Sequence, residues 1–166
     1  MKIKKTLVLL LSLSVLVSVF GQKRASDKFF EEIKTKNDVV KISIDNLESL
    51  QFEDYEKVYA PFEIKVHIFN KVKHPDSENE TGSYFKKSPF NEVKPDKSEN
   101  GMRVFTNQVG KSIYECHVCF MKENKLFLIS YFGDFKVEDL KTLKGMAKSF
   151  YEMGKGLKEM CNFTKN

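Results

Sequence analysis

Residues 112–132, SIYECHVCFMKENKLFLISYF, decide the fold of this 166-residue chain. Two apolar runs, Ser112–Lys122 and Leu126–Phe132, flank the polar triplet Glu123-Asn124-Lys125, which is the pattern of a β-hairpin. The second run is apolar at nearly every position, so we expect both of its faces to be buried, in the middle of a sheet or beneath helices. The hairpin therefore predicts the centre of a β-sheet.

The residues after the hairpin predict a turn and then a helix. We interpret Gly133-Asp134 as the turn and Asp134 as a helix-start residue rather than a catalytic acid. Apolar residues recur at helical spacing from about Val137 to Tyr151, with lysines opposite, which indicates an amphipathic helix. Gly154 and Gly156 then predict a weakening of the helical pattern before a last short helix that contains Cys161.

The residues before the hairpin predict a helix and further strands. Ser26 and Asp27 offer N-cap chemistry for a helix that buries Phe29, Phe30 and Ile33. Period-two alternation then predicts strands over 40–45 and 62–68, and order returns as a strand over 102–106. Residues 47–60 are mixed, and we expect a short helix or an irregular crossing there.

These elements predict an α+β fold with a mainly antiparallel sheet of four or five strands. The first and C-terminal helices are expected to pack on one face and to leave the other face partly wet. Residues 22–166 form a single domain in this interpretation. It carries a polar insertion at about 71–101, which is rich in charged residues and holds three prolines. The insertion is either a solvated loop or a mobile lid with a small aromatic anchor.

Residues 1–21 predict a secretory signal peptide, with cleavage between Gly21 and Gln22. Three lysines precede an apolar run of about fourteen residues, shorter than the roughly 20 that cross a bilayer. An uncleaved N-terminal anchor is the alternative. No cysteine lies near the cleavage position, so we expect no lipid anchor, no membrane span after cleavage, and a periplasmic or secreted product. The remaining 25 basic and 23 acidic residues give a charge of +2, too small to indicate nucleic-acid binding.

Cys116-His117-Val118-Cys119 is the candidate site for chemistry. Residues three apart in a strand are separated by roughly 10 Å and face opposite sides, so we expect no disulfide between these cysteines, which needs Cα atoms within about 7 Å. Haem attachment requires a histidine at position 120, where Phe120 stands. A structural role is favoured, with Cys116 on a core face and His117, Cys119 and Glu115 on the other. Redox and metal-binding roles stay open.

The remaining cysteine and histidines add few constraints. Cys161 either stays free or pairs with Cys116. His67 and His117 share the wet face in this interpretation, and together with His74 they are expected to be solvated surface residues. The chain has no nucleophile elbow, phosphate-binding glycine loop or zinc-protease helix. We therefore expect no cofactor and favour a non-enzymatic role.

Residues 128–135, LISYFGDF, followed by Val137–Leu143, VEDLKTL, resemble the ending of small exported Bacteroidota proteins grouped as domain-of-unknown-function family 4252. The leader and the helix from Asp27 to Ile33 before a Val-rich strand are also similar to that family. The segment 71–101 is longer and more polar than the family pattern, and Lys136 stands where members carry another acidic residue. The resemblance implies an exported α+β domain and no activity.

The sequence thus indicates an exported envelope protein, a non-enzymatic module that binds an unknown protein or small ligand. On this hypothesis, deleting Ser77 to Glu99 should leave folding intact and abolish binding. The alternative is a redox or metal-binding protein that uses Cys116, His117 and Cys119.

Overall fold

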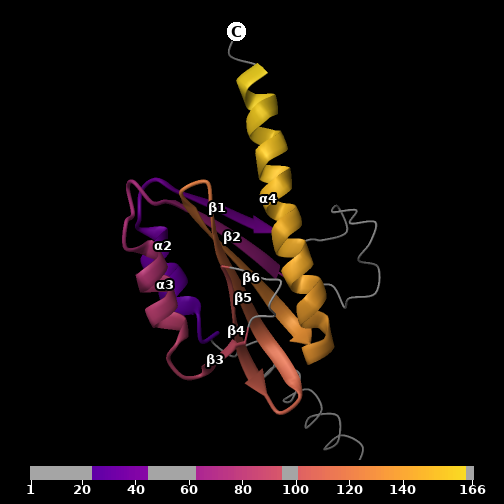
Figure 1. Ribbon diagram of the computed structural model, residues 1–166. Coiled ribbons are helices and arrows are strands. Elements are labelled where there is room, and N and C mark those ends of the chain that lie inside the picture. Colours follow the sequence, from indigo (N-terminus) through magenta and orange to yellow (C-terminus); the bar gives the residue numbers. More distant parts are fainter. Residues whose placement is uncertain (1–23, 45–62, 95–100, 164–166) are drawn as a thin grey trace, which may run out of the picture.

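The computed structural model describes residues 24–44, 63–94 and 101–163, with side chains described as far as residue 152. These residues form one six-stranded antiparallel sheet, in the order β1-β2-β6-β5-β4-β3 (Figure 1). The strands are β1 (Val39–Ile44), β2 (Glu63–Asn70), β3 (Phe90–Val93), β4 (Met102–Val109), β5 (Ser112–Lys122) and β6 (Lys125–Phe135). The leader with Gly21 and Gln22, and the expected crossing at 47–60, lie outside the described residues.

The hairpin expected from the sequence is confirmed as β5 and β6, in the middle of the sheet. Lys122 pairs with Lys125, and the two residues between them have positive φ values of 48° and 57°. That backbone twist matches the twist of the flanking strands. Both strands are eleven residues long, and in the sheet β2 lies beside β6 and β4 lies beside β5.

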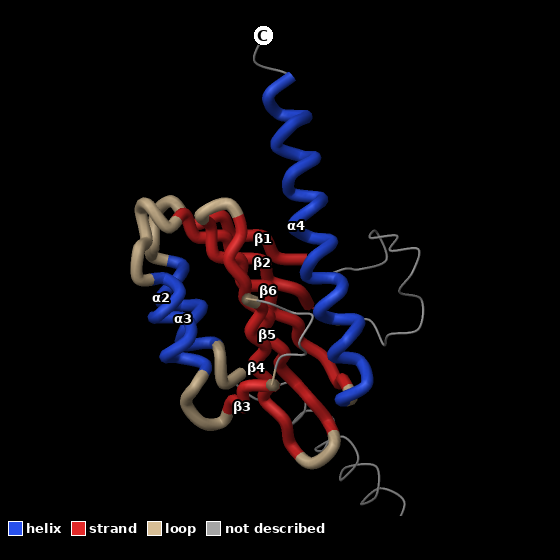
Figure 2. The backbone as a smooth tube through the Cα atoms, viewed as in Figure 1, coloured by secondary structure: helices blue, strands red, loops and turns tan. Residues whose placement is uncertain are grey.

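Helices cover both faces of the sheet, which corrects the expectation of one helical and one partly wet face (Figure 2). Helix α4 (Leu140–Phe163) packs on one face, while α2 (Asp27–Lys34) and α3 (Ser77–Phe85) pack on the other. The cause lies in β6, where every residue from Leu126 to Gly133 is buried. A strand that is apolar on both sides needs cover on both sides. The α+β class and the antiparallel sheet are confirmed.

The segment 71–101 is not a solvated loop where the structure describes it. It contains α3 and β3, the strand beyond the five that the sequence predicts. Phe85 and Phe90 are buried in the core beneath this helix, and their ring centroids lie 5.0 Å apart. The segment therefore completes the second helical face, and a deletion of residues 77–99 would open the core.

The strand β6 continues through Gly133-Asp134, so the turn expected there is absent. A β-carbon on Gly133 would lie 2.7 Å from the ring of buried Phe135, which explains the glycine by close packing. The helical region instead begins at Lys136, whose backbone N–H donates to the Asp139 carboxylate over 2.8 Å. A short 3-10 turn, η2 (Val137–Asp139), leads into α4, which runs unbroken past the two glycines to Phe163.

Candidate functional site

The two cysteines of the candidate motif lie on opposite faces of β5, as predicted. Cys116 packs in the core beneath α4, and Cys119 packs in the core beneath α2 and α3. Both are free, buried thiols, so the alternative pairing of Cys116 with Cys161 does not occur; the Cys161 side chain is outside the described part. Burial raises the pKa of each thiol to about 12. A thiol that stays protonated is a poor nucleophile and a poor metal ligand.

His117 is fully buried and lies between the sheet and the aromatic side chains of α3, which corrects its expected place on the surface. Its ring stacks on Phe85, with 4.3 Å between centroids. Its Nδ1 atom lies 2.9 Å from the Ser130 hydroxyl on β6, and its Nε2 atom lies 3.5 Å from the Glu115 carboxylate. Burial lowers the pKa of His117 even though Glu115 opposes that shift, so the imidazole is neutral at neutral pH.

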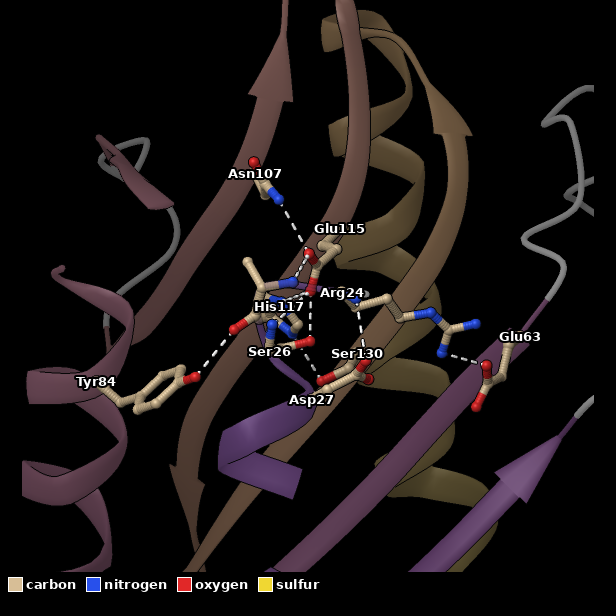
Figure 3. A network of polar contacts seen from close by, with 10 residues as sticks. Arg24, Ser26, Asp27, Glu63, Tyr84, Asn107, Glu115, His117 and Ser130 are labelled. Atoms are coloured by element: carbon tan, nitrogen blue, oxygen red, sulfur yellow. Dashed lines mark hydrogen bonds and ion pairs between the residues drawn. The ribbon is translucent and has the colours of Figure 1, made fainter. Parts of the chain in front are cut away.

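Glu115, two residues before His117 on the same face, is the centre of this polar cluster (Figure 3). Its buried carboxylate accepts hydrogen bonds from the backbone N–H groups of Ala25 (2.8 Å) and Ser26 (3.2 Å). It also accepts the Ser26 hydroxyl and the Asn107 side-chain amide, the latter over 2.9 Å. Burial acts to raise the pKa of Glu115, but His117 and these donors outweigh it and lower the pKa to about 2. Glu115 is therefore a buried anion at neutral pH.

This anion fixes the segment that precedes α2. The Ala25 carbonyl accepts a hydrogen bond from the Tyr84 hydroxyl on α3, at 2.9 Å. The guanidinium of Arg24 lies 4.1 Å above the centre of the Phe132 ring and forms an ion pair with Glu63 of β2. Residues 24–26 are thus bound by three strands and a helix, and Figure 3 shows the polar contacts of this segment with Glu115, Glu63 and Tyr84.

Ser130, His117 and Glu115 form a serine–histidine–carboxylate chain that resembles the order of a hydrolase triad. In this protein the serine and the histidine are both fully buried in the central strands. A nucleophile must reach its substrate, and here α2 and α3 cover the face on which these groups lie. The arrangement therefore positions the N-terminal segment and encloses Ser130 in the core, while the Nε2 atom of His117 has no hydrogen-bond partner within the residues that the structure describes.

The other two histidines do not join this cluster. His67 on β2 is buried against the ring of Phe30, with centroids 5.1 Å apart, and does not belong to the surface as expected. Burial is the main cause that lowers its pKa to about 4. His74 follows β2 and contacts the Asn37 carbonyl through Nε2 at 2.8 Å. Among the described residues, no three His, Cys, Asp or Glu side chains group as metal ligands.

The two edges of the sheet differ sharply. At one end β3 is four residues long, follows a cis Ser88-Pro89 bond, and carries Glu92 paired with Arg103 at 2.7 Å. Short strands, prolines and charges are the usual protection of an exposed edge. At the other end β1 presents Val40 and Ile42, which are 52% and 45% exposed. Within the described ranges, no strand lies on the outer side of β1.

Comparison with known proteins adds no relative. No family model, no curated protein and no solved structure matches this chain. None of the helices in the described part has the length and apolar character needed to cross a bilayer.

Proposed function

We propose that this chain is an exported, non-enzymatic interaction module that binds another polypeptide along the outer edge of β1. One observation carries the proposal: β1 is an edge strand on which the aliphatic Val40 and Ile42 are exposed, on the face opposite to that of Lys41 and Ser43. Edge strands offer unpaired backbone N–H and C=O groups, and exposed apolar residues on such a strand mark a site for strand addition.

The position of these side chains supports the proposal. Val40 and Ile42 stand opposite Ile68 and Val66 of β2, on the face that α4 covers. They continue the apolar surface of the core to the margin of the sheet. An added strand would bury them and would satisfy the outer backbone groups of β1 at the same time. Isolated exposed apolar residues are common on surfaces, but here they coincide with an unprotected strand edge.

The chemical groups of the chain support a binding role over the redox or metal-binding alternative. Cys116 and Cys119 are buried on opposite faces, and His117 is enclosed by aromatic rings. Phe85 and Phe90 lie in the segment 71–101, which the sequence predicts as an insertion. Both are core residues and do not form an aromatic anchor for a small ligand. A polypeptide is therefore the favoured partner class.

Export remains part of the proposal. The leader at 1–21 and cleavage before Gln22 predict a periplasmic or secreted location, and the similarity to domain-of-unknown-function family 4252 agrees with it. In the mature chain the docked segment at 24–26 would lie only two residues from the new N-terminus. Residues 24–26, just after the cleavage position, would then complete the folded domain by binding Glu115 and Glu63.

A native mass spectrum of the protein exported with its own leader tests the proposal. The expected species begins at Gln22 and carries the mass of a bound polypeptide. In a variant with Ile42→Lys the bound mass should be lost, because a charge at the edge opposes strand addition. Val72→Lys is the matched control, since Val72 is 76% exposed and lies outside the strands. A bare chain in all three samples would contradict the proposal.

A further inference from the structure

We propose that the polypeptide bound along β1 is a second copy of this chain. The inference rests on the proposed function and identifies its partner. Two β1 strands would pair antiparallel about a twofold axis perpendicular to the sheet, with Ile42 opposite Ile42 of the other copy. The two six-stranded sheets would join into one continuous sheet.

The sequence of β1 is self-complementary in this register. A twofold axis perpendicular to the sheet keeps each face on its own side, so residues directly opposite must face the same way. A pairing centred on Lys41 would place two lysines directly opposite each other, which is destabilising. A pairing centred on Ile42 places Val40 opposite Ile44, and Lys41 opposite Ser43. The second register removes the repulsion and pairs aliphatic residues with one another on the face that α4 covers.

The rows of side chains then continue across the junction. Within one copy, Ile42 pairs with Val66 and Ile44 pairs with Ile64. Ile64 and Val66 are buried in the core beneath α4, and Ile44 packs against that core. In the dimer each of these rows would extend through β1 into the matching β-branched residues of the second copy. Cross-strand pairs of β-branched residues are among the stabilising contacts of sheets.

The charge that could protect this edge is held elsewhere. An exposed lysine on an edge strand normally discourages pairing. Here the Lys41 ammonium donates to the backbone carbonyls of Lys34 and Lys36, both over 2.9 Å, at the end of α2. Its charge is thereby drawn over the α2 face and away from the aliphatic side of β1. The protected β3 edge offers no comparable surface.

Site-specific disulfide formation tests the pairing and its register. Each variant carries one new cysteine in a Cys161→Ser background, in which Cys116 and Cys119 are buried. Ile42→Cys should oxidise to a covalent dimer, because opposite residues have Cα atoms about 4.5–5.5 Å apart, within disulfide range. Val40→Cys is the matched control on the same strand: in this register its two copies are offset by four residues, roughly 13 Å.

The inference expects the Ile42→Cys variant to cross-link at least tenfold faster than Val40→Cys, and the protein without added cysteine to be dimeric by light scattering. Circular dichroism confirms that each variant folds. Equal cross-linking of both variants, or a monomer at micromolar concentration, would overturn the inference. Hydrogen exchange of the β1 amides in that monomer separates the inferred self-association from the proposed function. Rapid exchange at every second residue of β1 would show that its outer edge is open, and another polypeptide would then be the partner. Protection of all β1 amides would show that the edge is already paired and would overturn the proposed function as well.

Discussion

Replacing Glu115 by glutamine is the sharpest test of the buried cluster. The substitution keeps the shape of the side chain but removes its charge and turns one acceptor oxygen into a donor. One carboxylate oxygen accepts from Ala25 and Asn107, and the other accepts from the backbone and hydroxyl of Ser26. Whichever way the amide is oriented, its NH2 group faces two donors.

Two contributions set the magnitude. Each hydrogen bond to a charged group contributes about 1.5–3 kcal/mol, and two of the four are lost. The Ser26 hydroxyl can rotate to accept from the new amide and recover part of this. We expect Glu115→Gln to lower the free energy of unfolding by about 3 kcal/mol, in the range for a broken buried charge contact. That is a large part of the total for a domain of this size.

The pH dependence gives an independent check with a definite sign. The pKa of Glu115 is about 2 in the folded protein, against an ordinary value of 4.5. A lowered carboxyl pKa stabilises the fold above pH 4.5, and this stability is lost as the pH falls from 4.5 to 2. At 1.36 kcal/mol per pKa unit, the loss is about 3 kcal/mol. Glu115→Gln should lack this part of the acid dependence.

Urea unfolding followed by far-ultraviolet circular dichroism, between pH 7 and pH 2.5, measures both effects. Glu92→Gln is the control, because Glu92 makes a partly exposed ion pair with Arg103 whose loss should cost about 0–1 kcal/mol. If Glu115→Gln is as stable as this control at pH 7 and keeps the acid dependence of the parent protein, the reasoning about the cluster is wrong.

Three further substitutions test the core. Phe85→Ala, in α3, should lower the free energy of unfolding by about 3–5 kcal/mol in denaturant titrations, as for other buried phenylalanines. A loss below 1 kcal/mol would show that Phe85 is not a core residue. His67→Phe should remove the His67 part of the fall in stability between pH 6.5 and pH 4, up to about 3 kcal/mol, because the pKa of His67 is about 4 when folded and the unfolded chain binds the proton first; an unchanged slope would refute its burial. Gly133→Ala should lower the melting temperature, since its β-carbon would meet the Phe135 ring, and the overpacking costs roughly 1–3 kcal/mol; an unaltered melting temperature would show that the ring has room to move.

The sequence predicts the elements in which apolar periodicity is strong. The first helix and the β2 strand carry clear periodic patterns, and the hairpin has two apolar runs around a polar turn; the structure confirms all three. The run at 126–132 also indicates cover on both faces, but composition does not say which segment supplies the second layer. That layer comes from α2 together with α3, and the nine residues of α3, Ser77–Phe85, are mostly polar and give only a weak helical pattern.

The candidate site is harder to predict because its contacts join distant parts of the chain. Ser26 has the expected position before α2, yet its hydroxyl binds Glu115, 89 residues away, instead of capping the helix. Alternation along β5 does place Glu115 and His117 on one face. The sequence signal for the cluster was therefore Glu115, an acidic residue that shares a face with His117 in a strand expected at the centre of the sheet. Its partners follow from the packing of α2, which the sequence does not encode locally.

The central claim is that the thiols, the imidazoles and the buried carboxylate serve the fold, while the protein acts through its β1 edge. Thiol modification in a Cys161→Ser protein, followed against denaturant concentration with and without added zinc, tests this most directly. The account predicts that Cys116 and Cys119 react only through global unfolding, at a rate that tracks the free energy of unfolding, and that zinc changes nothing. Rapid modification of either thiol in the folded protein, or protection by one equivalent of zinc, would contradict it.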